Sequence, residues 1–442
     1  MSRFLLASMP VPGHILPMTL IAEELILHNH EVVWYSSKFF KDKIEATGAR
    51  FAPILSALDY GDNRYNDYFP ERATLKGLQQ IKFDFKHLFL DGVEGHLKDL
   101  RAILKDYPAD ALVHDPAMVA GKILGETGVI PNAVLNITVL GIPGRDVAPF
   151  GLGIPPLPGT LGRLRNRVMR AVANNLVFRD VNQHGAAILD RLRFPRFPFG
   201  PLDSKFLFLH PGTPQFEYPR SDLPPSVHFI GPLLPHFNGD FVAPAWWSDV
   251  TNAHKSVVLV TQGTIATDTS ELIQPVLQAL ANEDVLVVAA TGGQDLNAPV
   301  PANARVTKFI PFNVLMPHVK AYITNGGYGG VTIALAHGVP CVCAGSTEDK
   351  PEVGNRVAYS GVGINLKTAR PTPDQIRSAV GQIMREARYR DGAKRIQAEF
   401  AKHDAPNEAA RLLAQLAITH KPVLRTSQDT WTNADAMTLA TA

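Results

Sequence analysis

The stretch Thr324-Asn-Gly-Gly-Tyr-Gly-Gly330 joins two regular patterns and decides how the surrounding chain folds. An apolar strand pattern, Ala321–Thr324, leads into it, and an amphipathic helical pattern, Val331–His337, follows it. Four glycines can leave backbone N–H groups uncovered where the helix begins, and the helix dipole favours an anion there. The stretch predicts either a strand-to-helix turn that binds phosphate or a tight turn without a ligand.

The segments around this turn add a specific order and spacing. A short apolar strand pattern, Cys341–Ala344, follows the helix and leads into the acidic turn Gly345–Pro351. Such a turn would lie beyond the carboxyl end of a strand, where the ligands of open α/β sheets collect. Together with Phe309–Pro311 upstream, this run resembles the donor-binding signature of family 1 glycosyltransferases, the UDP-glycosyltransferase-like enzymes that use nucleotide sugars.

The resemblance covers roughly residues 1–415 and is strongest over 305–366. It implies the α/β GT-B fold, in which two Rossmann-like, doubly wound parallel-sheet domains face a central cleft. It also implies an inverting hexosyltransferase that moves a sugar from a nucleoside-diphosphate sugar, with UDP as the expected nucleotide, to an acceptor hydroxyl. The nucleotide sugar is then a co-substrate, and no cofactor is expected.

Length and composition agree with two globular domains. The chain of 442 residues exceeds what one hydrophobic core supports. A net charge of +2 gives no overall attraction to polyanions, so we expect no nucleic-acid partner and at most peripheral membrane contact. The absence of a membrane-spanning run or a secretory signal indicates a cytoplasmic protein. The only cysteines, Cys341 and Cys343, alternate on one strand and are expected in the core.

Strand and helix patterns alternate along both halves of the chain, which predicts parallel sheets with right-handed crossovers. The first unit comprises a strand at Arg3–Ala7, a turn over 9–17, a helix from Met18 to about His28 and a strand at Glu31–Tyr35. Further strands are expected at Phe51–Ile54, Ala111–His114, Ala133–Ile137, Val257–Thr261, Val285–Ala290, Val306–Ile310, Ala321–Thr324, Cys341–Ala344 and Gly363–Leu366.

A rise in proline density over 211–244 suggests a domain boundary. We expect an acceptor-binding domain that carries the catalytic base over 1–233 and a linker over 234–254. A nucleotide-sugar-binding domain over 255–400 and a C-terminal helix with a poorly packed tail over 401–442 would complete the chain.

His14 lies in the first strand-to-helix turn, in the order Gly13-His14-x-x-Pro17. Histidine can take a proton from a hydroxyl near neutral pH, but a lone loop histidine is weak evidence for catalysis. The order of these residues looks like the turn that bears the family's catalytic base. Asp115 stands where such enzymes keep the carboxylate that orients the base, although a helix N-cap before Pro116 is the alternative.

The resemblance also implies a set of donor-binding residues with distinct roles. Gly263 and Thr264 would approach the donor phosphates, and the segment Phe309–Phe312 would hold the nucleotide base. The glycine-rich turn would hold the diphosphate through Gly327, Gly329 and the N–H groups of Gly330 and Val331, and Asp349 would bind the sugar hydroxyls. The set is Gly13, Gly263, Thr264, Phe309, Ile310, Phe312, Asn325, Gly326, Gly327, Gly329, Gly330, Val331, Asp349 and Lys350.

Three positions depart from the family's pattern. Asn325 stands where a histidine is usual, Lys350 where a glutamine is usual, and Gly330 lacks the hydroxyl of a serine or threonine. Lys350 either helps to select the donor sugar or is a solvated partner of Glu348 or Glu352. No metal is expected, because no Asp-x-Asp pair or His/Cys cluster stands at a strand end.

The irregular apolar segment over 141–162 is expected to line the pocket of a small, partly apolar acceptor, such as a polyketide, phenolic, sterol or lipid. A surface loop packed on its own domain is the alternative. The helix that follows carries Arg163, Arg165, Arg167 and Arg170, spread around its circumference. This spacing favours a solvated face over a membrane contact or a patch for an acidic acceptor.

Two other functions compete with glycosyl transfer. A nucleotide-sugar epimerase has a related architecture, and Asn325 and Lys350 leave room for a non-catalytic, nucleotide-sugar-binding accessory protein. The presence of both His14 and Asp115 favours the enzyme, and we interpret the chain as a glycosyltransferase.

Overall fold

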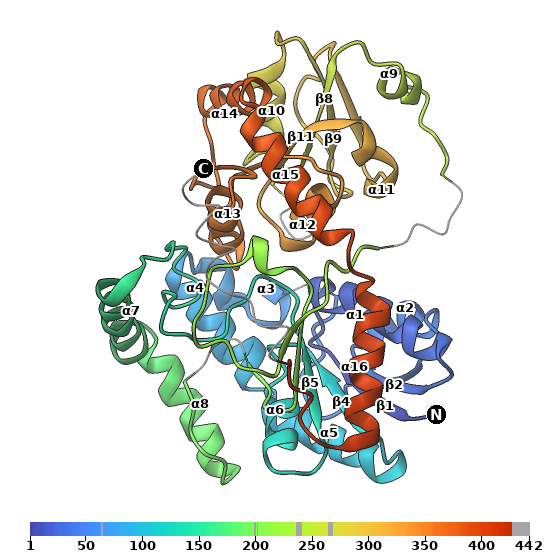
Figure 1. The fold of residues 1–442 in the computed structure, drawn as a ribbon, viewed down its shortest axis with the longest axis vertical. Coiled ribbons are helices and arrows are strands. Elements are labelled where there is room, and N and C mark those ends of the chain that lie inside the picture. The colour runs from blue at the N-terminus through green and yellow to red at the C-terminus, as the bar shows by residue number, and fades with distance from the viewer. Residues whose placement is uncertain (63–64, 199, 201, 236–240, 264–267, 427–442) are drawn as a thin grey trace.

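The computed structural model describes residues 1–62, 65–198, 200, 202–235, 241–263 and 268–426, which form two α/β domains (Figure 1). Each domain is built on one sheet with helices packed on both of its faces. All pairings between described strands are parallel. The predicted pair of doubly wound parallel-sheet domains is therefore confirmed.

The first domain has a seven-stranded sheet in the order β3-β2-β1-β4-β5-β6-β7. Its strands are β1 (Arg3–Ala7), β2 (Glu31–Ser36), β3 (Arg50–Pro53), β4 (Ala111–His114), β5 (Asn132–Leu135), β6 (Leu207–His210) and β7 (Val227–Phe229). Its helices are α1 (Pro12–Leu27), α2 (Lys41–Glu45), α3 (Tyr65–Tyr68), α4 (Leu78–Asp84), α5 (Val93–Asp106), α6 (Val119–Glu126), α7 (Gly159–Val172) and α8 (Arg179–Arg191). Short 3₁₀ and π turns are η1 (Lys38–Phe40), η2 (Pro70–Thr74), η3 (Phe85–Leu90), η4 (Ala173–Val177) and η5 (Pro214–Phe216).

The second domain has a six-stranded sheet in the order β10-β9-β8-β11-β12-β13. Its strands are β8 (Ser256–Thr261), β9 (Val285–Ala290), β10 (Ala304–Thr307), β11 (Val319–Thr324), β12 (Cys341–Cys343) and β13 (Gly363–Asn365). The helical elements of the second half are α9 (Trp247–Thr251), α10 (Ile273–Leu280), α11 (Phe312–Leu315), η6 (Met316–His318), α12 (Tyr328–Ala336), α13 (Lys350–Tyr359), α14 (Pro373–Arg385), α15 (Ala387–Phe400) and α16 (Ala405–Thr419).

The strand order reverses direction at one point in each sheet. In the first sheet the switch lies between β1 and β4, and in the second it lies between β8 and β11. Loops leave the carboxyl ends of such neighbouring strands in opposite directions, and the crevice between them is where doubly wound sheets bind ligands. The two switch points therefore mark where a functional site is expected.

The central strands β1, β4 and β8 are buried on both faces, as in parallel sheets covered by helices. Phe4 and Leu6 of β1 enter one core, whereas Leu5 enters the core on the opposite face. The last helix, α16, belongs to the first of these cores, where Leu412 and Leu416 pack beside α1 (Figure 1). The chain thus returns to the first domain after completing the second.

The structure differs from the predicted local structure in two places. The helix predicted from Met18 begins at Pro12, because proline suits the first helical position, and Pro17 removes only the hydrogen bond to Gly13 near the helix start. Strands β6 and β7, which pair with each other, were not predicted, and β7 lies within the proline-rich region. Prolines at a strand's flanks leave its ladder intact.

Other expectations have simpler outcomes. Cys341 and Cys343 are buried free thiols, as predicted. Among the described residues, no helix is both long and apolar enough to cross a membrane. The predicted tail beyond Thr426 lies outside the described residues.

Candidate active site

The switch point of the first sheet brings His14 and Asp115 together. β1 and β4 are neighbours, and His14 lies in the first turn of α1 after β1, whereas Asp115 directly follows β4. His14 Nδ1 lies 3.1 Å from Asp115 Oδ1. The histidine side chain is 14% exposed and the aspartate is fully buried. The pairing predicted from the sequence is present, and the side of the imidazole that carries Nε2 is turned away from Asp115.

The Asp115 carboxylate is held by its backbone neighbours. Met9 N donates to Oδ2 at 2.6 Å, and Ala117 N donates to Oδ1 at 2.7 Å. Burial by itself would raise the pKa of Asp115, but His14 and these N–H groups outweigh it and lower the pKa below its usual value. Asp115 caps no helix, since Met118 is the N-cap of α6. An ionised, immobile carboxylate therefore faces the imidazole.

His14 Nδ1 and Asp115 lie at hydrogen-bonding distance but are not aligned as an ideal hydrogen bond. Catalytic hydrogen bonds in ligand-free enzymes are commonly of this kind and tighten when substrate binds. Beside them, a Cβ atom added at Gly13 would meet no heavy atom within 4 Å. Gly13 has no positive φ and lies in α1, so its part here is to leave open space beside His14.

The switch point of the second sheet carries the glycine-rich turn at the start of α12. Gly326 has a φ of 91°, which favours glycine, and Gly327 is the N-cap residue. In the part of the chain that the structure describes, the N–H groups of Tyr328, Gly329 and Gly330 donate to no other residue. This is the arrangement that binds anions at a helix N-terminus.

The Val331 N–H group, predicted to hold the diphosphate at this turn, is not free to do so in the structure. The helix begins at Tyr328 rather than near Val331, so the Val331 N–H is already used in a 3.1 Å hydrogen bond to Gly327 O. The Tyr328 N–H, which was not predicted, is uncovered in its place. Helix boundaries inside glycine runs are hard to predict because glycine carries no strong preference that marks the first residue.

Gly330 is required by a neighbour that sequence reasoning missed. A Cβ atom at this position would lie 2.6 Å from the hydroxyl of Tyr322, a fully buried side chain on β11. The tyrosine thus occupies the space that a serine or threonine side chain would need. The departure from the family's pattern has a packing cause.

Asn325 links the glycine turns of two adjacent strands. Its Nδ2 donates a short hydrogen bond to Gln262 O, directly before Gly263, whose φ is 78°. The two turns are thereby fixed to each other after β11 and β8. Thr264, predicted beside Gly263, lies outside the described residues.

The predicted base-binding segment follows β10 and presents one exposed ring. Phe309 is 69% exposed, and a Cβ atom at Gly293 would lie 3.1 Å from its ring. Ile310 is buried in the core and Phe312 begins α11. Within this segment, Phe309 has the open aromatic surface on which a nucleobase can stack.

The acidic turn after β12 touches the opposite domain. Asp349 Oδ2 accepts a short hydrogen bond from Thr138 Oγ1, which follows β5 in the first domain. Burial raises the pKa of Asp349, and the Thr138 hydrogen bond and Lys350 only partly oppose this. Lys350 Nζ pairs closely with Glu348 and donates to Thr347 Oγ1 at 3.3 Å. Thr138 carried no signal in the sequence that would have linked it to Asp349.

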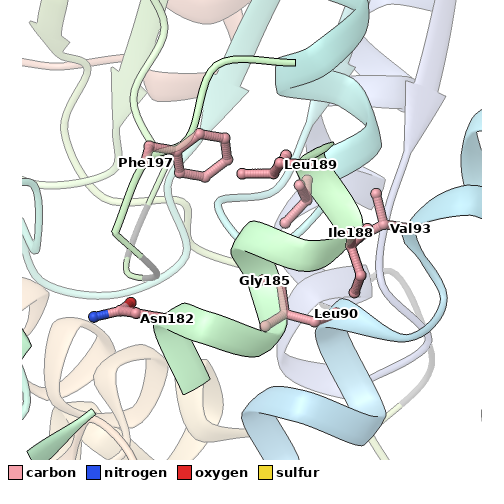
Figure 2. Close-up of a pocket in the computed structure, with 8 residues that line it drawn as sticks. Leu90, Val93, Asn182, Gly185, Ile188, Leu189 and Phe197 are labelled. Atoms are coloured by element: carbon pink, nitrogen blue, oxygen red, sulfur yellow. The ribbon is translucent and has the colours of Figure 1, made fainter. Parts of the chain in front are cut away.

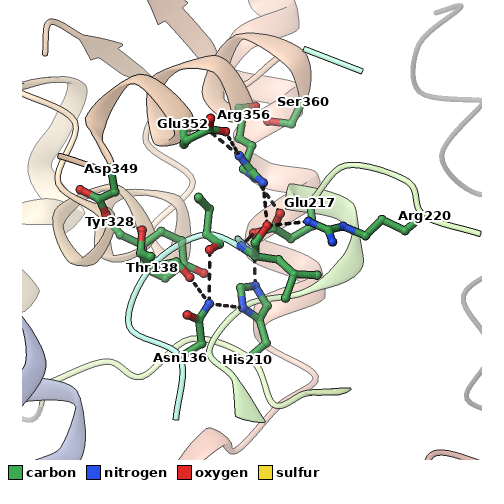
Figure 3. A network of polar contacts seen from close by, with 12 residues as sticks. Asn136, Thr138, His210, Glu217, Arg220, Tyr328, Asp349, Glu352, Arg356 and Ser360 are labelled. Carbon is green, nitrogen blue, oxygen red and sulfur yellow. Dashed lines mark hydrogen bonds and ion pairs between the residues drawn. The ribbon is translucent and has the colours of Figure 1, made fainter. Parts of the chain in front are cut away.

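A buried ion-pair network joins the domains beside this turn (Figure 3). Arg356 on α13 donates from Nε to Glu217 Oε2 at 2.6 Å and from Nη1 to Glu352 Oε2 at 3.0 Å. Its Nη2 donates to Leu140 O at 3.1 Å, and its guanidinium lies 4.2 Å from the ring centroid of Tyr218. Glu217, Tyr218 and Leu140 belong to the first domain, so this arginine fixes α13 against it.

The charges in the network compensate each other. Burial would raise the pKa of Glu217, but Arg356 and His210 hold it well below its usual range. The Glu217 carboxylate therefore makes its full contribution to stability at pH values above the usual pKa of glutamate. This contribution is lost as the pH falls from that value through the lowered pKa of Glu217. The same helix is tied further, because Glu352 Oε1 accepts from the N–H groups of Gly151 and Gly153 at 3.0 and 2.8 Å.

A small apolar pocket lies elsewhere in the first domain (Figure 2). It is formed by η3, α5, α6 and α8, with Leu90, Val93, Ile188 and Phe197 among its lining residues. None of its lining residues is a predicted site residue, and its one polar side chain is Asn182. It lies against α8, and neither His14 nor Asp115 lines it.

The chain is similar in sequence and in overall structure to known glycosyltransferases. Residues 274–416 match the family described as erythromycin biosynthesis protein CIII-like, C-terminal domain. The chain is 42% identical to 4'-demethylrebeccamycin synthase of Lentzea aerocolonigenes, covering 94% of this chain and 99% of that protein. It is 30% identical to UDP-glycosyltransferase 2 of Phaeomoniella chlamydospora, covering 93% and 95%. The structure of the calicheamicin glycosyltransferase CalG4 has a TM-score of 0.71 at 21% identity and covers 95% of this chain and 99% of that one.

Removing the central arginine tests the network. Arg356→Ala leaves Glu217 and Glu352 buried without their cation, so we expect the free energy of unfolding to fall by about 3–5 kcal/mol. Urea denaturation followed by circular dichroism measures this change. Arg390→Ala, at an exposed arginine on α15, is the matched control and should change stability by less than about 0.5 kcal/mol. Equal effects of the two substitutions would contradict the assigned role.

The contact between Gly330 and Tyr322 gives a second test. Gly330→Ala should destabilise the protein by about 1–3 kcal/mol through overpacking, and adding Tyr322→Phe should restore much of the loss by removing the hydroxyl. Gly329→Ala is the control on the same helix, because a Cβ atom there meets nothing within 4 Å. Thermal unfolding of the four proteins decides the matter, and an equal loss for Gly329→Ala and Gly330→Ala would exclude the steric explanation.

Proposed function

Because the chain belongs to the nucleotide-sugar-dependent glycosyltransferases of family 1, we propose that it transfers a sugar from a UDP-type donor to a hydroxyl of a small, partly apolar natural product, with inversion. It is a glycosyltransferase of the natural-product type with the GT-B fold. The observation that carries the mechanism is the 3.1 Å pairing of His14 with the buried Asp115 at the switch point of the first sheet.

In the proposed reaction, His14 acts as the general base. Nε2 takes the proton of the acceptor hydroxyl while that oxygen attacks the anomeric carbon from the face opposite the nucleotide. The bond between the anomeric carbon and the diphosphate oxygen breaks, so the configuration inverts and the nucleoside diphosphate leaves. Asp115 holds the imidazole in place and stabilises the imidazolium that forms.

The second domain would bind the donor. The uncovered N–H groups of Tyr328, Gly329 and Gly330 suit the negative charge that develops on the leaving diphosphate. The exposed ring of Phe309 is suited to stack on the base. Asp349 would accept hydrogen bonds from sugar hydroxyls after exchanging its bond to Thr138 for the donor. The name of one relative, UDP-glycosyltransferase 2, supports UDP as the nucleotide.

The acceptor would bind to the first domain beside His14. The segment over 141–158 is apolar, precedes α7 and reaches α13 of the second domain through Gly151 and Gly153. The similarity to 4'-demethylrebeccamycin synthase supports a natural-product acceptor. Incubation with panels of nucleotide sugars and hydroxyl-bearing acceptors, followed by mass spectrometry, tests both choices.

Replacing the base should separate chemistry from binding. We expect His14→Ala to lower the transfer rate by about 10²- to 10⁴-fold while nucleoside-diphosphate affinity, measured by calorimetry, stays unchanged. Asp115→Asn should lower the rate in the same direction but less, because it removes only the orienting charge. His28→Ala, at the C-terminal end of the same helix, should leave the rate unchanged. A His14→Ala enzyme within threefold of the original, about 0.6 kcal/mol, would refute this mechanism.

The acidic turn should select the sugar more than it holds the nucleotide. Asp349→Asn removes a charge-assisted acceptor, and we expect a loss of about one to two decades in kcat/KM with the donors that use it. Lys350→Gln should change the ranking among donor sugars. Asp374→Asn, at a solvent-exposed carboxylate on α14, is the control.

The measurement for this prediction is kcat/KM for several nucleotide sugars, together with the dissociation constant of the free nucleoside diphosphate. A uniform loss across all donors would mean that the turn does not read the sugar. An unchanged ranking of the donor sugars in the Lys350→Gln enzyme would show that Lys350 is only an ion-pair partner of Glu348.

A further inference from the structure

Helix α7 packs on the protein with its polar side. Its buried residues are Gly162 and Asn166, and Asn166 Nδ2 donates to Arg145 O at 3.1 Å. Arg170 reaches inward from the same face and donates to Gly144 O and Val147 O. Carbonyl groups of the preceding loop, rather than an apolar core, thus hold this helix. The sequence-based expectation of a solvated charged face is wrong for this side, because the arginine there is used in packing.

The outward side of α7 is apolar. Large side chains recur on α7 and η4 at intervals of three or four residues and are exposed to solvent, which places them along one stripe of the helix. They are Leu161 (74% exposed), Leu164 (56%), Val168 (53%) and Val172 (42%) on α7 and Leu176 (71%) on η4, and Leu157 (44%) is exposed just before the helix. Exposed apolar residues scattered singly need no explanation, but a continuous stripe marks an interaction surface.

The ionisable side chains of α7 itself are all positive. The α7 sequence contains four arginines and no aspartate or glutamate. Arg163 pairs with Asp146 at 2.8 Å, and Arg165 donates to a carbonyl group, which leaves its charge uncompensated. Arg167 is exposed and has no ionic partner among the described residues. The edge of the stripe therefore attracts anions.

We propose that the stripe of α7 docks on an anionic phospholipid surface, with the leucines and valines entering the acyl boundary and the arginines contacting headgroup phosphates. An amphipathic helix with arginine beside an exposed apolar face lies in the membrane plane in this way. In Figure 1, α7 stands at the outer edge of the first domain, and among the described elements none covers its apolar side. This proposal goes beyond the proposed function and does not depend on it.

A second copy of the chain fits the surface less well. A two-fold contact through α7 would bring the arginines of both copies together, and like charges repel. Stable protein interfaces also use roughly 20–30 residues on each side, whereas the stripe offers six large apolar side chains. A membrane requires neither complementarity of shape nor a large flat area.

Membrane docking would place the stripe and the loop before it at the same surface. That loop leads from the helix to Gly151 and Gly153, which bond Glu352 of the second domain. An apolar molecule dissolved in the bilayer would therefore reach the protein at the segment that connects both domains.

Vesicle co-sedimentation of the full chain tests the proposal. We expect binding to vesicles of phosphatidylcholine and phosphatidylglycerol in equal amounts, much weaker binding to phosphatidylcholine alone, and loss of binding as salt is raised. Leu161→Gln should weaken binding about tenfold and Arg167→Gln about fivefold. Ile418→Gln and Arg411→Gln on α16 are the matched controls, since Ile418 is 75% exposed and Arg411 is also at the surface, and they should bind as the original does.

Three outcomes would overturn the proposal. They are absence of binding to the anionic vesicles, equal binding to both kinds of vesicle, and equal weakening by the α7 and α16 substitutions. Size-exclusion chromatography tests whether a second copy of the chain binds the stripe instead. A dimer that Leu161→Gln dissociates would assign the stripe to that second copy. Thermal unfolding should be unchanged for all four variants, since each side chain is exposed.

Discussion

The geometry between the domains depends on one buried cation. Arg356 meets two carboxylates, Glu217 from the first domain and Glu352 from its own helix, and its planar guanidinium also covers the ring of Tyr218. Ions buried in this way are costly unless each donor is satisfied, and a matched set favours one relative position of the elements that carry it. Since α13 begins at Lys350, directly after Asp349, fixing this helix also fixes the acidic turn that faces Thr138.

The two halves of the candidate site offer different kinds of charge: ionisable side chains in the first domain and backbone N–H dipoles in the second. In the first domain His14 and Asp115 would handle a proton, and hydrogen bonds from Met9 N and Ala117 N, together with His14, keep the buried carboxylate ionised. In the second domain backbone N–H groups at the start of α12 offer partial charges that need no counter-ion and cannot be neutralised by a change of pH. Both halves lie where the strand order reverses, so the topology of each sheet positions its own part of the candidate site.

Features that depend on neighbours in the chain were predictable, and features that depend on distant residues were not. The glycine turn and the parallel strands carry local signals, and the place of Asp115 beside His14 came from the family resemblance. The partners of Arg356 and Asp349 lie 139 and 211 residues away in sequence, and no spacing rule links them. The tyrosine that requires glycine at 330 is close in sequence, but its role depends on how β11 packs under α12. β7 was missed because prolines around it resembled a linker.

Helix α7 shows a limit of periodicity as evidence. A helical pattern separates an apolar side from a polar side, but it does not state which side faces the protein. The usual assumption is that the apolar side is buried, because burial of apolar surface is the main stabilising term. Here the neighbouring loop offers carbonyl groups to Asn166 and Arg170, so satisfying those acceptors decides the orientation. The apolar side is then left for a partner outside the chain, and the absence of acidic residues on the helix restricts that partner to one that tolerates positive charge.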